Sequence, residues 1–423
     1  MGQYAGEVKM ANTPSKQDKL WHHPDFLLLW GGQTVSQVGS QVTLWALPLV
    51  AVLTLKATPF QMGILAFVGR LPLLLIGLVA GVLVDRVSSR IILIVTDFGR
   101  AALIGSIPLA ALLHRLSLTQ FYVVTFLVGC LSAFFDVAYQ SFLPSLVERD
   151  QLIVANSRLE ASNALASIIG PGFAGVLVQL FSGPIAILVD AFSFFLSAFS
   201  LLFVRVREAP HAIAIKHRWL WNEIGEGIYF VWRQPLIRVL MLTSALFNFF
   251  DSILLAEYVF YLTRTLGMGA IFVGTVGVAG GVGWLVGALL AEPITKRVGM
   301  GFALSGCILL ACLAEACIAL ANGPFLFVLC LVMAGEFLIQ CVATIYVINN
   351  TTVRQMLLPF EIRGRVNALV RVISGGATAL GALLAAVLAQ SYGLRLTLII
   401  AAAGTLSAFV LIVVSPLRSV KSV

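Results

Sequence analysis

The stretch Gly81-Val82-Leu83-Val84-Asp85-Arg86-Val87-Ser88-Ser89-Arg90 places three charges between two long apolar runs, residues 60–84 and 91–113. A helix that spans a membrane is favoured when cations follow it on the cytoplasmic side. An acid in the same turn needs a neutralising partner, such as a hydrogen bond or a helix N-terminus. We therefore interpret this charged loop as a joint between two membrane helices.

The composition indicates an all-α integral membrane protein. Of the 423 residues, 60% are hydrophobic and only 11% are charged, whereas soluble domains have about 45–50% apolar and about 25% charged residues. The formal net charge of +8 could suggest a nucleic-acid partner. We expect none, because the cations lie in the predicted loops, where they orient a membrane protein in the lipid bilayer.

Runs of about 20 apolar residues, enough to cross a hydrocarbon layer of about 30 Å, predict about twelve membrane spans. The predicted spans are 26–53, 60–84, 91–113, 120–143, 157–181, 184–204, 237–263, 270–292, 300–321, 324–348, 366–390 and 394–415. An even number of spans puts both termini on one side. Of the 27 basic residues, 21 fall on that side and four on the other, which predicts cytoplasmic termini in a multi-pass protein of the plasma membrane, the inner membrane of a bacterium.

The longest polar interval after the N-terminus, residues 205–236, divides the spans into two groups of six. Its mixture of aromatic and charged residues predicts a linker helix in the membrane interface. The two groups share features, because Gly81, Leu83 and Arg90 are repeated as Gly287, Leu289 and Lys296. We predict two pseudo-symmetric six-helix bundles. The expected domains are a tail (1–25), the N-terminal bundle (26–204), the linker (205–236), the C-terminal bundle (237–415) and a second tail (416–423).

The chain resembles the major facilitator superfamily, whose loop motif is G-x-L-x-D-R-x-G-R-R in loose form. The matching positions are Gly81, Leu83, Asp85, Arg86 and Arg90, with Ser88 in place of a glycine. Residues 143–156 and 363–369 also resemble the drug:proton antiporter branch that contains macrolide-efflux and enterobactin-export proteins. The resemblance covers about residues 20–415 and implies alternating access between two halves.

The resemblance also implies that Gly81, Asp85, Arg86 and Arg90 form a latch that closes the cytoplasmic side in one state. The alternative is a positively charged anchor with an accidental acid. In the fifth span, Gly170, Pro171 and Gly175 resemble a packing motif of exporters, although Ala166 and Ala174 replace two of its glycines. The small side chains allow close helix contact, so the alternative here is ordinary helix packing.

Charged side chains deep in a membrane are candidates for function because they are costly unless paired or hydrated. By depth and acidity, Asp251 and Glu336, followed by Asp136, are our candidates for proton coupling, and Arg70 for binding an anionic substrate group or tuning an acid. Each could instead belong to a buried ion pair. Three further acids fall toward the outer side, namely Asp190, Glu257 and Glu315.

A stripe of Gln33, Gln37 and Gln41 follows one face of the first span at i, i+4 and i+8. These amides could line a substrate cavity or join two helices, and the spacing favours neither. The six cysteines lie inside predicted spans and are interpreted as small buried hydrophobes.

The chain contains no convincing phosphate-binding loop, metalloprotease motif or nucleophile elbow. We therefore predict a monomeric secondary transporter and no enzyme, with no catalytic residue, cofactor or metal. Its expected activity is proton-coupled efflux of amphipathic small molecules such as drugs, macrolides or siderophore-like compounds. Two alternatives remain open: a lipid or lysophospholipid translocator on the same fold, and a membrane receptor or scaffold that transports nothing.

Overall fold

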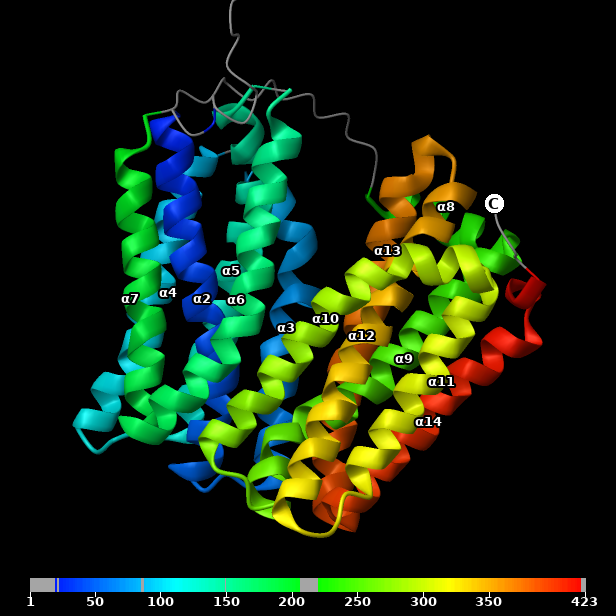
Figure 1. The fold of residues 1–423 in the computed structure, drawn as a ribbon. Coiled ribbons are helices and arrows are strands. Elements are labelled where there is room, and N and C mark those ends of the chain that lie inside the picture. Colours follow the sequence, from blue (N-terminus) through cyan, green and yellow to red (C-terminus); the bar gives the residue numbers. More distant parts are fainter. Residues whose placement is uncertain (1–19, 21–22, 85–86, 149, 206–219, 420–423) are drawn as a thin grey trace, which may run out of the picture.

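The computed structural model describes the chain except for residues 1–19, 21–22, 85–86, 149, 206–219 and 420–423. The described residues form helices and no strand (Figure 1). Twelve of these helices are long and apolar enough to cross a membrane, as the sequence predicts. They are α2 (Pro24–Leu53), α3 (Pro59–Val84), α4 (Ser89–Leu112), α5 (Leu118–Leu146), α6 (Leu152–Leu180), α7 (Gly183–Phe203), α9 (Pro235–Phe260), α10 (Ala270–Val298), α11 (Met300–Ala319), α12 (Phe325–Leu357), α13 (Phe360–Tyr392) and α14 (Leu394–Val414).

Most helix ends agree with the predicted spans to within a few residues. The largest difference is at α12, which continues to Leu357, followed by the start of α13 at Phe360 and the end of α10 at Val298. Polar residues such as Asn349 and Arg363 end the apolar run without ending the helix. These helices therefore extend beyond their apolar segments.

The ends of several helices are set by local hydrogen bonds. Before α3, the Gln61 backbone N–H donates to the Thr58 hydroxyl (3.3 Å) and the Thr58 backbone N–H donates to Gln61 Oε1 (2.8 Å). This reciprocal pair is a capping box, which satisfies two backbone donors at the start of a helix. Gly299 and Gly393 connect consecutive helices with φ angles of 84° and 81°, a conformation that strongly favours glycine.

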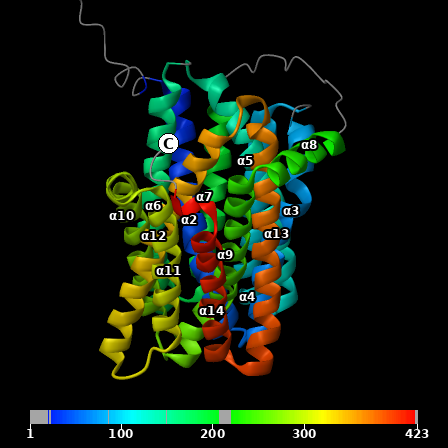
Figure 2. The same ribbon diagram turned by 90° about the vertical axis from the view of Figure 1, so that its right-hand side faces the viewer.

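The helices form two groups, α2–α7 and α9–α14, and most buried apolar cores lie within one group. A further core lies mainly in the second group and includes Leu49 of α2. We call the two groups the N-terminal and C-terminal halves. The face where α2 begins and α14 ends is the terminal face, and the opposite one is the distal face (Figure 1). The shorter helix α8 (Leu220–Arg233) lies at the terminal face beside α13 (Figure 2) and buries Val231 against Val366 and Val370.

The two halves contact each other mainly through α6 with α10 and α3 with α13. These contacts include positions toward the distal face, where a Cβ atom on Gly63 of α3 would lie 2.7 Å from the Ala386 Cα of α13. Arg264, in the π-helical continuation of α9 (η1, Tyr261–Thr265), donates from Nη2 to the Val52 carbonyl oxygen (2.8 Å). The helices diverge toward the terminal face (Figure 1). The contacts therefore close the distal side.

Candidate functional site

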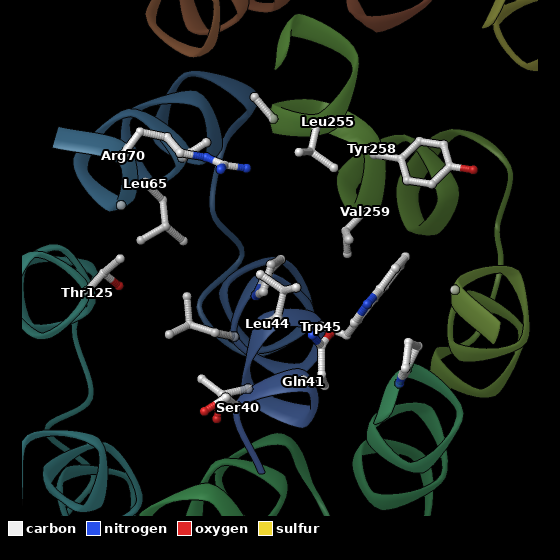
Figure 3. A pocket seen from close by; sticks show the side chains of 18 of the residues that line it. Ser40, Gln41, Leu44, Trp45, Leu65, Arg70, Thr125, Leu255, Tyr258 and Val259 are labelled. Carbon is white, nitrogen blue, oxygen red and sulfur yellow. The ribbon is translucent and has the colours of Figure 1, made fainter. Parts of the chain in front are cut away.

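A central cavity of about 740 Å³ lies between the two halves and is lined by both. Its wall is mainly apolar and aromatic, with Trp45 from α2, Tyr258 from α9 and Trp284 from α10. Figure 3 shows Trp45 and Tyr258 among its lining residues. Few charged groups reach this cavity. A site of this size and lining fits a drug-sized amphipathic molecule.

Glu336 is the predicted coupling residue that lines this cavity. Its side chain is only 5% exposed, and its Oε1 accepts a hydrogen bond from Gln340 Nε2, one turn later on α12 (2.9 Å). Gly280 of α10 leaves room for the carboxyl group, because a Cβ atom there would lie 2.9 Å from Glu336 Oε1. A buried carboxyl group therefore lies at the contact between α10 and α12.

The structure places Asp251 near Glu336 but Asp136 elsewhere. Asp251 is half-buried on α9, within electrostatic range of Glu336 and of Arg70 across the interface. Asp136 is exposed on α5, and its electrostatic partners are Arg100 and Arg371. Two of the three predicted acids thus lie in one region, together with the predicted basic residue.

Arg70 reaches from α3 toward Leu255 of α9 (Figure 3) and lines the central cavity. Its side chain is exposed to the cavity space. No hydrogen bond or ion pair holds its guanidinium group among the described residues. Arg70, which belongs to the N-terminal half, can therefore contact a molecule bound in the cavity.

The three glutamines of α2 lie in different surroundings. Gln33 is buried and donates from Nε2 to Ser197 Oγ of α7 (3.0 Å), a contact inside the N-terminal half. Gln41 lines the cavity and donates to Ser167 Oγ of α6 (3.4 Å). The buried Oε1 of Gln37 has no hydrogen-bond partner among the described residues. Only Gln41 reaches the cavity wall.

The exporter-like motif of α6 lies at two helix contacts. Gly170 faces α2, since a Cβ atom there would lie 2.4 Å from the Gln41 Cβ. Pro171 faces α10, since a Cβ atom added to Gly277 would lie 2.5 Å from the Pro171 Cβ. Gly175 also contacts α10. The motif residues therefore pack α6 against helices of both halves.

The predicted latch is only partly described. Asp85 and Arg86 lie outside the described residues, and Gly81 lies in the last turn of α3. Arg90 donates from Nε to the Leu201 carbonyl oxygen (3.2 Å) and from Nη2 to that of Leu202 (2.7 Å). A cation at these last carbonyl groups of α7 stabilises the helix end. Arg90 thus connects α4 to α7.

Two charged residues of the site region were not selected from the sequence. Asp190 is 1% exposed, lines the cavity and accepts at Oδ1 from Ser193 Oγ (3.1 Å). Arg371 of α13 lines a second, smaller cavity beside Arg70. Trp45 lies one turn after Gln41, so continuation of the glutamine stripe could have identified it. No sequence signal distinguishes Arg371 from the other cations near helix ends.

Comparison with known proteins assigns this arrangement to a family. The family described as transmembrane secretion effector, within the major facilitator superfamily, matches residues 21–423. The chain belongs to this family. A relative named multidrug efflux pump Tap, from Mycolicibacterium fortuitum, is 29% identical and covers 88% of this chain and 91% of its own. Macrolide efflux protein A from Streptococcus pyogenes is 22% identical and covers 88% and 90%.

Solved structures of the superfamily have the same fold. A mutant of the nucleoside transporter NupG matches with a TM-score of 0.79 at 11% identity, over 92% of this chain and 99% of its own. A bacterial homologue of the iron transporter ferroportin in an inward-facing state matches with a TM-score of 0.72 at 18% identity, over 93% and 98%. The family match and the efflux relatives identify this major facilitator protein as a multi-pass membrane transporter rather than an enzyme, a receptor or a scaffold.

Proposed function

We propose that this major facilitator protein exports amphipathic small molecules, such as drugs, macrolides or siderophore-like compounds, in exchange for protons. The observation that carries the proposal is the mainly apolar cavity between the halves with the buried carboxyl group of Glu336 in its wall. The efflux activity in the names of its relatives supports the direction of transport.

The proposed cycle follows from the placement of the groups. With the distal side closed, a substrate enters from the terminal face, which the distribution of basic residues predicts to be cytoplasmic in the plasma or inner membrane. A buried carboxyl group can alternate between a protonated and a charged form as the substrate enters and leaves. Rocking of the halves then presents the cavity to the outer side. We propose that one monomer completes the cycle.

Inverted membrane vesicles test this function. A pH gradient that is acidic inside the vesicles should drive uptake of ethidium or a macrolide into vesicles that contain the protein. Nigericin, which collapses this gradient, should abolish the uptake. Vesicles without the protein are the control. Uptake that is the same with and without the gradient would contradict proton coupling, and absence of any uptake or exchange would contradict export of these compounds.

A further inference from the structure

A second cavity of about 250 Å³ adjoins the central one and has a different chemical character. It shares Arg70 and Thr378 with the central cavity. It lies between α3 of the N-terminal half and helices α9 and α13 of the C-terminal half. Its lining residues are Arg70, Leu73, Asn248, Arg371, Ser374, Gly375 and Thr378. We call it the basic annex.

The annex contains two guanidinium groups that the protein does not neutralise by direct contact. Arg70 and Arg371 are both exposed. Among the residues that the structure describes, neither forms a hydrogen bond or an ion pair. The acids that act on them electrostatically are Asp251 for Arg70 and Asp136 for Arg371. The two positive charges beside one small cavity repel each other. An anion bound between them would reduce this electrostatic repulsion.

Asn248 and Ser374 can add hydrogen bonds to an oxyanion in the annex. The Asn248 amide donates one hydrogen bond to the Ser244 carbonyl oxygen (2.7 Å), which leaves its second N–H available. The Ser374 hydroxyl adds a further donor to the wall, whereas the Thr378 hydroxyl donates to the Ser374 carbonyl oxygen (2.9 Å). Guanidinium groups bind carboxylate and phosphate oxygens in pairs of parallel hydrogen bonds, which a single ammonium group cannot do.

We propose that the basic annex is a binding subsite for an oxyanion group, a carboxylate or a phosphate, whose apolar remainder occupies the central cavity. The inference rests on the proposed function, because it names a substrate class for the same site: amphipathic molecules with one anionic group. Two sources share this chemistry, namely a water-soluble amphipathic anion and an anionic lipid headgroup. The annex residues come from both halves, so a bound anion bridges the halves.

Calorimetry on the purified full-length protein in phosphatidylcholine nanodiscs tests the subsite. The probe is 1-naphthyl phosphate, and 1-naphthol is the matched uncharged molecule. We expect the phosphate to bind at least about tenfold more tightly than the naphthol, because a hydrogen bond to a charged group contributes enough for such a factor. Arg70→Gln and Arg371→Gln should each weaken binding of 1-naphthyl phosphate about tenfold or more.

Two variants make the test specific. Arg371→Lys keeps the charge but loses the paired hydrogen bonds, so we expect binding between that of the wild type and that of Arg371→Gln. Arg115→Gln removes an exposed cation from the distal loop between α4 and α5 and should leave the affinity unchanged. Equal affinity of both probes, or equal weakening by Arg115→Gln and Arg371→Gln, would overturn the proposal.

The source of the anion is tested by adding phosphatidylglycerol to the nanodiscs. If a lipid headgroup occupies the annex, phosphatidylglycerol should reduce the apparent affinity for 1-naphthyl phosphate in the wild type but not in Arg371→Gln. If the occupant is a soluble anion, the affinity should be the same in both membranes. Either result supports the subsite once the arginine dependence is established.

Failure of the subsite differs from failure of the proposed function. Binding that does not depend on Arg70 or Arg371, together with gradient-driven efflux of ethidium, would contradict only the proposed subsite. Arginine-dependent binding without any gradient-driven transport by the wild type would remove only proton-coupled export.

Discussion

Gly175 of α6 and Gly274 of α10 lie in such close contact that a Cβ atom on Gly175 would stand 3.0 Å from the Gly274 Cα and 2.5 Å from the Ala270 carbonyl oxygen. Both neighbouring atoms belong to the backbone, so neither can move aside cheaply. This contact joins the two halves on the distal side of the central cavity. It should therefore control how easily the distal side closes.

We expect Gly175→Ala to destabilise the distal-closed state by about 1–3 kcal/mol, the usual cost of overpacking a tight contact. Distances between spin labels in the distal loops, at Arg115 and Asn322, should then shift toward longer values. Gly376→Ala is the matched control, because a Cβ atom there meets no atom within 4 Å. An unchanged distance distribution in Gly175→Ala would show that this contact does not hold the halves together.

Glu336→Gln should separate substrate exchange from gradient-driven efflux. The amide keeps the size of the side chain but cannot carry a proton, so we expect exchange to persist while gradient-driven efflux falls at least about tenfold, the effect of losing about 1.4 kcal/mol of coupling. Transport into vesicles with and without a pH gradient measures both activities.

The control for Glu336→Gln is Glu292→Gln. Glu292 is exposed on α10 and pairs with Lys296 at 2.5 Å, and exposed ion pairs of this kind contribute little. We expect wild-type efflux in this variant. Gradient-driven efflux by Glu336→Gln at the same rate would assign the coupling to another residue.

Glu257 has an unusual environment for a carboxyl group. It is fully buried, and neither carboxyl oxygen has a hydrogen-bond partner among the described residues. Because burial of an unpartnered polar group is costly, Glu257→Met should stabilise the folded protein by about 1–3 kcal/mol. The unfolding temperature in detergent should rise.

Glu315→Met is the comparison for that prediction. Glu315 is also fully buried, but its Oε2 accepts a hydrogen bond from Thr405 Oγ1 (2.9 Å). Removal of this carboxyl group breaks that bond and leaves the Thr405 hydroxyl only the Ala401 carbonyl oxygen as acceptor (3.1 Å). The gain in stability should therefore be smaller. A lower unfolding temperature for Glu257→Met than for the wild type would mean that the carboxyl group stabilises the fold.

The predicted orientation in the membrane can be tested with single cysteines in a cysteine-free background. A cysteine at Asn322, in the distal loop between α11 and α12, should react in intact cells with a thiol reagent that cannot cross membranes. A cysteine at Arg297, exposed near the terminal end of α10, should react only after the cells are permeabilised. The reverse pattern would place the termini outside.

The sequence predicts the membrane helices well because a run of about 20 apolar residues has few other interpretations. Position along a span also predicts that Glu336 and Arg70 belong to the site region, because both lie near the middle of long helices. The direction in which a side chain faces is harder to predict, because it depends on how each helix is rotated against its neighbours. Gln33 and Gln41 share one stripe, yet only Gln41 reaches the cavity.

Arg371 illustrates the same limit from the other direction. It lies where the apolar run of α13 begins, so hydropathy assigns it to the cations at the helix ends. Only the packing of α13 against α3 places it beside Arg70 in the basic annex. A sequence pattern within one half cannot show a site that is built from both halves.

The central claim is that substrate movement through the cavity is exchanged for protons, and proton flux tests it most directly. Purified protein is reconstituted into liposomes that contain the pH-sensitive dye pyranine and no imposed gradient, and ethidium is added outside. The account predicts a rise in internal pH with the wild type and none with Glu336→Gln, while liposomes preloaded with ethidium show substrate exchange with both proteins. Substrate movement by the wild type without any change in internal pH would contradict it.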